Sequence, residues 1–86
     1  MIIISTASIN NNQVIVRELI NANASLNIQD INGRTALIDA SDYARFFIVG
    51  KLIYAGANLN IQDIFGKTAL IYGNFTLTFF NISTPY

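Results

Sequence analysis

Residue types that could bind phosphate occur twice in the chain. Gly66-Lys67-Thr68 is similar to the end of a phosphate-binding loop, in which backbone N–H groups and a lysine hold phosphate oxygens. That motif needs a glycine five residues before Gly66, where Ile61 stands. The sequence Gly33-Arg34-Thr35 has the same form earlier in the chain. We therefore interpret both stretches as structural turns.

Four aspartates are the other candidates for chemistry. Asp39 and Asp42 lie three residues apart, but a hard cation such as Ca²⁺ takes about six to eight oxygen ligands, so this pair is too small a site. We expect them on a solvated helix face. Asp30 and Asp63 would have to converge to act as a catalytic pair. We predict instead that each accepts backbone N–H bonds within its own turn.

The composition excludes most other site chemistry. The chain has no His and no Cys, which removes the commonest general base and the thiolate nucleophile and metal ligand. Five basic and five acidic residues give a net charge of zero, so no basic surface for nucleic acid is expected. We predict that the protein is not an enzyme and uses no cofactor, metal ion or small-molecule substrate.

The apolar content indicates a folded chain that does not cross a membrane. Apolar residues make up 52% of the 86 residues and charged residues 12%, the opposite of a disordered composition. The apolar runs are shorter than the roughly 18 residues of a membrane span. The first four residues, Met1-Ile2-Ile3-Ile4, lack the basic start of a signal peptide. We expect an intracellular, cytoplasmic protein.

An internal repeat determines where the helices lie. Of the twelve residues from Asn27 to Ile38, all but Asn32 and Arg34 recur 33 residues later, from Asn60 to Ile71. Apolar residues spaced three and four apart predict helices at residues 14–22 and 46–55. Shorter helices are expected at residues 2–8, at 35–42, and after Thr68, with Thr35 and Thr68 as N-caps.

The same repeat predicts the backbone of the turns and the core. Asn11 and Asn23 occupy turn positions at which glycine is expected. Asparagine can replace glycine there, because it tolerates the left-handed region better than other non-glycine residues. We therefore predict positive φ angles at Asn23 and Gly56. The predicted apolar core between the repeats consists of Leu19, Ile20, Leu37, Ile48, Val49, Leu52, Ile53 and Leu70.

The order of short helix, turn, longer helix, polar loop and Asp-x-x-Gly-x-Thr at this period resembles the ankyrin repeat. The characteristic Thr-Pro-Leu-His element is present as Thr35-Ala36-Leu37-Ile38 and Thr68-Ala69-Leu70-Ile71, so proline and histidine are missing. The resemblance implies an all-α, helix-turn-helix solenoid with projecting hairpin loops. It also implies binding of other proteins through the loop tips and the concave face of the short helices.

We divide the chain into a repeat stack at residues 1–73, with units at about 1–33, 34–66 and a partial 67–73, and a degenerate tail at 74–86. Gly73, Pro85 and the loss of the apolar stripe predict that the tail is not the second helix of a third unit. Its uncharged, β-prone stretch at residues 75–80 leads us to expect that deleting the tail improves solubility or leaves folding unchanged.

Positions that differ between the copies, or that project from turns, are the candidates for contact with a partner protein. The expected partner-binding residues are Ile31, Asn32, Arg34, Asp39, Asp42, Tyr43, Phe65, Lys67 and Tyr72. The alternative is that the chain is a non-functional or capless fragment of a longer array, since repeat arrays need about three units and polar caps.

Overall fold

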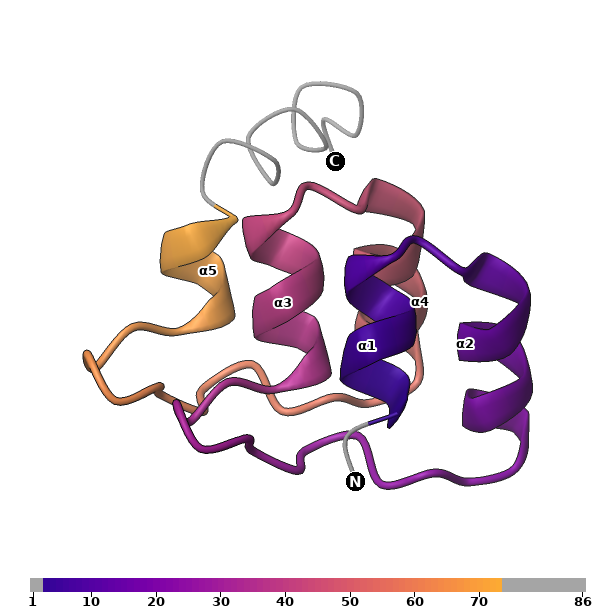
Figure 1. Cartoon of the computed structure of the whole chain (residues 1–86), viewed down its shortest axis with the longest axis horizontal. Helices are drawn as coiled ribbons and strands as arrows, with labels where there is room; N and C mark the ends of the chain where they lie inside the picture. Colours follow the sequence, from indigo (N-terminus) through magenta and orange to yellow (C-terminus); the bar gives the residue numbers. More distant parts are fainter. Residues whose placement is uncertain (1–2, 74–86) are drawn as a thin grey trace.

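The computed structural model describes residues 3–73, which contain helices and no strands. The helices are α1 (Ile3–Ile9), α2 (Gln13–Asn21), α3 (Ala36–Asp42), α4 (Phe46–Tyr54) and α5 (Ala69–Tyr72). The short helices α1, α3 and α5 pack in one row, and the longer α2 and α4 form a second row (Figure 1). The predicted helices agree with these bounds to within one or two residues. Predictions for residues 74–86 lie outside the described residues.

The core lies between the two rows of helices. Its largest buried apolar side chains, each 1% exposed or less, are Leu37 and Ile38 of α3, Ile48, Leu52 and Val49 of α4, and Val16 of α2. The three- and four-residue spacing of Ile48, Val49 and Leu52 places them on one face of α4, as predicted. The core prediction is therefore confirmed for Leu37, Ile48, Val49 and Leu52, and Leu19 and Ile20 pack against it while partly buried.

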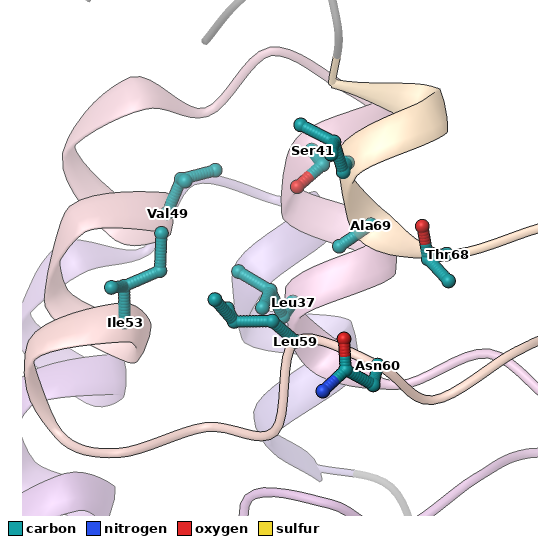
Figure 2. Close-up of a pocket in the computed structure, with 9 residues that line it drawn as sticks. Leu37, Ser41, Val49, Ile53, Leu59, Asn60, Thr68 and Ala69 are labelled. Carbon is teal, nitrogen blue, oxygen red and sulfur yellow. The ribbon is translucent and has the colours of Figure 1, made fainter.

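The core prediction is wrong for two residues. Ile53 is 40% exposed and Leu70 is 59% exposed. Both line a mostly apolar pocket of about 210 Å³, which lies among α3, α4, α5 and the connection between α4 and α5 (Figure 2). Leu37, the repeat equivalent of Leu70, is buried because α5 packs on α3. No described element packs on α5 in the same way, so Leu70 stays at the surface.

The two predicted N-caps differ. The Thr35 hydroxyl accepts a hydrogen bond from the Ile38 N–H at 3.2 Å, which satisfies one of the free donors at the start of α3. Thr68 occupies the same backbone position before α5, but its side chain makes no capping bond. The capping prediction is confirmed for Thr35 and wrong for Thr68.

The connections between helices use the left-handed backbone region. Asn23 has a φ of 61° and Gly56 a φ of 94°, which confirms both predicted positive angles. Asn11, with a φ of 55°, replaces a glycine in the turn between α1 and α2. Ala44 has a φ of 54° in the equivalent turn between α3 and α4, although its side chain disfavours that region.

Replacing Ala44 with glycine is expected to stabilise the protein by about 1 kcal/mol, because glycine adopts positive φ without steric strain. Ala44 is exposed, so no packing is lost. Urea denaturation of Ala44→Gly beside Gly50→Ala checks this result. Gly50 lies within α4 in open space, so Gly50→Ala should also stabilise the protein, because alanine favours a helix interior more than glycine does. If Ala44→Gly lowered the free energy of unfolding, the φ assigned to this turn would be wrong.

Candidate functional site

Two hairpin loops project beside the short helices, and we call them the first finger (residues 27–34) and the second finger (residues 60–67). In the first finger, the backbone N–H groups of Asn32 and Arg34 each donate to Asp30 Oδ1 at 2.9 Å. In the second finger, Phe65 and Lys67 donate in the same way to Asp63 Oδ1, at 2.9 and 3.0 Å. The prediction that these aspartates hold the turns is confirmed.

The two fingers are joined to each other. The backbone N–H of Ile64 donates to the carbonyl oxygen of Asn32 at 3.0 Å. The Gln29 amide Nε2 donates to the carbonyl oxygen of Gly33 at 2.9 Å and to that of Gln62 at 3.0 Å. These bonds hold the finger tips at a fixed spacing. Gln29 was not among the predicted site residues, although its recurrence as Gln62 marks it as part of the repeat.

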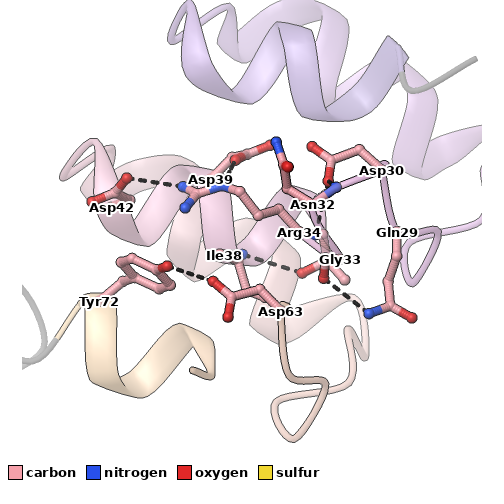
Figure 3. A network of polar contacts seen from close by, with 11 residues as sticks. Gln29, Asp30, Asn32, Gly33, Arg34, Ile38, Asp39, Asp42, Asp63 and Tyr72 are labelled. Atoms are coloured by element: carbon pink, nitrogen blue, oxygen red, sulfur yellow. Dashed lines mark hydrogen bonds and ion pairs between the residues drawn. The ribbon is translucent and has the colours of Figure 1, made fainter. Parts of the chain in front are cut away.

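Arg34 connects the first finger to α3. Its Nε donates to Asp39 Oδ1 at 2.7 Å and its Nη2 to Asp42 Oδ2 at 2.9 Å (Figure 3). Asp39 is only 3% exposed, so the expectation of a solvated face is wrong for this residue. A buried carboxylate needs a paired cation, and Arg34 supplies it through the turn that precedes the helix. Asp42 remains exposed at the helix end.

Tyr72 of α5 extends this cluster to the second finger. The Arg34 guanidinium carbon lies 4.7 Å from the centre of the Tyr72 ring, a cation–π geometry. The Tyr72 hydroxyl donates a hydrogen bond to Asp63 Oδ2 (Figure 3). Lys67 Nζ lies 5.6 Å from the centre of the same ring. We call Arg34, Asp39, Asp42, Asp63 and Tyr72 the Arg34 network. It ties both fingers to α3 and α5.

The network shifts the pKa values of its acids in opposite directions. Burial raises the pKa of the Asp39 carboxyl above its ordinary value, and the hydrogen bond and charge of Arg34 oppose that rise. The hydrogen bond from Tyr72 lowers the pKa of Asp63, and the backbone N–H groups of its turn act in the same direction. The same bond raises the pKa of the Tyr72 hydroxyl.

Replacing Tyr72 with phenylalanine is expected to reduce stability at neutral pH and to have less effect in acid. A lowered folded-state pKa means that Asp63 stabilises the protein above its ordinary pKa of 3.8 and that this contribution is lost as the pH falls further. Without the hydroxyl, the pKa of Asp63 should return toward 3.8. Asp39 is present in both proteins, so its effect largely cancels.

Thermal unfolding of the wild type and Tyr72→Phe between pH 7 and pH 2.5 measures this, with NMR titration of the Asp63 carboxyl as a direct readout. The difference in melting temperature should shrink below about pH 4. A difference that stayed constant down to the lowest pH would show that the hydroxyl does not interact with the ionised form of Asp63.

The structure divides the nine predicted partner-binding residues into two groups. Arg34, Asp39 and Tyr72 make contacts within the molecule and are partly or fully buried. The other residues are at the surface, and three of these are large: Ile31 is 95% exposed, Phe65 74% and Tyr43 49%. The remaining exposed ones are Asn32, Asp42 and Lys67.

The described residues offer neither a metal site nor a membrane span. No group of three or more acidic residues in this part of the chain could hold a metal ion, and it contains no His or Cys. None of the helices in residues 3–73 has the length and apolar character needed to cross a membrane.

Paired helices at a 33-residue period, with bonded hairpin fingers along one side, define this protein as a helical repeat solenoid. Residues 1–63 match the family described as ankyrin repeats (3 copies). The chain belongs to the ankyrin repeat family, which confirms the resemblance and the predicted all-α fold. A comparison with curated proteins gives no match.

Proposed function

We propose that the chain is a protein-binding module whose contact surface runs across the two finger tips and the end of α3. The carrying observation is that the fingers are fixed in place by backbone bonds while their largest apolar side chains point to solvent. Ile31 and Phe65, at the tips, are 95% and 74% exposed. Exposed aromatic and aliphatic side chains on a rigid frame are typical anchors of protein interfaces.

Polar groups of both charges surround these anchors. Asp42 and Lys67 are exposed beside Tyr43 and Phe65, respectively. In this proposal Arg34, Asp39 and Tyr72 act mainly by positioning the fingers, because they are partly or fully buried and their polar groups bond within the molecule. Asp42 also pairs with Arg34, but it stays exposed. Such a surface is small, so we expect a dissociation constant nearer micromolar than nanomolar. The family's usual role in protein binding supports the proposal.

Comparative affinity purification tests the proposal even when the partner has not been identified. The baits are the wild type, Tyr43→Ala with Phe65→Ala, and Arg17→Ala with Glu18→Ala. The substituted side chains of both double variants are exposed, so the melting temperature should change little. Proteins retained by the wild type and by the Arg17→Ala, Glu18→Ala variant of α2 should be lost from the Tyr43→Ala, Phe65→Ala aromatic variant, as quantified by mass spectrometry.

The opposite pattern, in which the α2 pair is needed and the aromatic pair is not, would place the interface on the longer helices. If neither variant changed what is retained, neither face would be the interface and the proposal would fail.

A further inference from the structure

The solvent-facing side of α4 differs in kind from that of α2, although the repeat gives both helices the same position in their units. On α2, Ile15 is exposed, and so are five further positions, which are mostly polar: Gln13, Val14, Arg17, Glu18 and Asn21. At the equivalent positions, 33 residues later, α4 carries Phe46, Phe47, Gly50, Lys51 and Tyr54. The fold therefore accepts polar residues here, and its stability does not require the aromatic set.

A hollow lies on the solvent-facing side of α4. Phe46, Phe47, Gly50, Lys51 and Tyr54 line a shallow depression of about 390 Å³. Phe46 is 44% exposed, Phe47 50% and Tyr54 95%. We call these five residues the α4 face.

Gly50 lies at the centre of the α4 face, within the helix. Glycine in a helix interior weakens the helix, but the missing Cβ also allows another group to come close to the backbone. Here a Cβ added at Gly50 would meet no atom within 4 Å. Close packing against the described residues therefore does not account for this glycine, and the space over its backbone is open to an outside group.

The charge of the α4 face limits what can dock there. Its charged residue is Lys51, and α4 contains no acidic residue. The Lys51 ammonium lies 5.4 Å from the centre of the Phe47 ring, so the positive charge is held at the edge of the hollow. A symmetric contact with a second copy would bring two Lys51 side chains together. A single cation is also too little charge for stable binding to an anionic membrane.

We propose that the α4 face is a second protein-docking surface, which binds a peptide segment with an apolar side chain next to a carboxylate. The apolar side chain enters the hollow over Gly50 between the aromatic rings. The adjacent aspartate or glutamate of the partner pairs with Lys51. This surface lies on α4 and is separate from the finger tips, so each of the two proposed binding surfaces can be tested without the other.

A library of random 12-residue peptides displayed on phage, selected against the full chain, supplies the probe. Selected peptides should share a leucine or aromatic residue beside an acidic residue. Affinities for the wild type and Gly50→Arg are then measured by fluorescence polarisation with a synthetic selected peptide. Gly50→Arg introduces the residue that α2 has at the equivalent position, Arg17. The long side chain should fill the hollow and weaken binding about tenfold or more.

Two further variants separate the possible explanations. Lys51→Arg should retain the peptide, whereas a new selection on Lys51→Glu should enrich basic instead of acidic residues. Tyr43→Ala with Phe65→Ala, the finger-tip variant, should bind the selected peptide as the wild type does. Circular dichroism confirms that each variant is folded before its affinity is compared.

Several results would overturn the proposal. These are peptides that bind Gly50→Arg as well as the wild type, selected peptides with no acidic preference, or a selection that yields no binder. Self-association in analytical ultracentrifugation that Gly50→Arg abolishes would assign the face to a second copy instead. Sedimentation with vesicles of anionic phospholipid that depends on Lys51 would assign it to a membrane surface.

Discussion

Leu52→Ala is expected to abolish cooperative thermal unfolding of the protein. Leu52 is fully buried between the helix rows, and truncating such a side chain costs about 2–5 kcal/mol in lost transfer free energy and cavity formation. A stack of this size has about 3–5 kcal/mol of stability in total. Circular dichroism at 222 nm as a function of temperature (a standard helix readout) measures the outcome.

Leu70→Ala is the matched control, because Leu70 is the same residue type on a neighbouring helix but is 59% exposed. It should change the free energy of unfolding by no more than about 0.5 kcal/mol. If Leu52→Ala kept a cooperative transition within a few degrees of the wild type, the core between α3 and α4 would not be what holds the stack together.

Gly33→Ala is expected to destabilise the protein far more than Gly66→Ala, although the two glycines occupy the same position of the two fingers. Their φ angles are 75° and 74°, so the backbone strain of an alanine is the same at both, about 1–2 kcal/mol. At Gly33 the added Cβ would also lie 2.9 Å from Asp63 Cα, whereas at Gly66 it meets nothing within 4 Å.

The backbone of the second finger must move away to accommodate the alanine at Gly33, at a further cost of about 1–3 kcal/mol. That movement also strains the Ile64-to-Asn32 hydrogen bond. Urea denaturation of both variants gives the difference, which isolates the contact between the fingers. Equal destabilisation of the two variants would mean that the fingers do not pack together in solution.

The repeat period allowed most of the fold to be predicted. Two copies that agree in apolar spacing define which residues face the core, and Asp30 and Asp63 at equivalent positions indicate a shared structural role. The prediction was wrong for Ile53, Leu70 and Thr68. A repeat predicts the environment of a residue only where a neighbouring unit covers it. Leu70 and Thr68 lie in the last described unit, and Ile53 lies on α4, the last of the longer helices that the structure describes.

The sequence was less informative about contacts between different types of residue. Arg34 and Asp39 were both assigned to a partner surface, because these positions differ between the copies. The pairing between finger and helix was not apparent from spacing. Gly73 was interpreted only as a helix breaker. A Cβ there would lie 3.0 Å from Ser41 Cβ, so this glycine allows α5 to approach α3 closely.

The aromatic side of α4 can be recognised in the sequence from the positions at which the two copies differ. Comparing the copies position by position shows that Phe46 and Tyr54 replace the polar residues Gln13 and Asn21 at exposed places, and that Phe47 replaces the smaller Val14. Differences between repeats on the solvent side are therefore as informative about binding as similarities are about packing.

Hydrogen–deuterium exchange tests most directly whether the finger tips form the protein-binding surface. The sample is the wild-type chain with a partner that the Tyr43→Ala and Phe65→Ala bait fails to retain. We predict new protection of backbone amides at residues 30–34, 42–45 and 63–67 in the complex, and unchanged exchange in α2. Protection confined to α2 or α4, with the finger amides exchanging as in the free chain, would contradict the account.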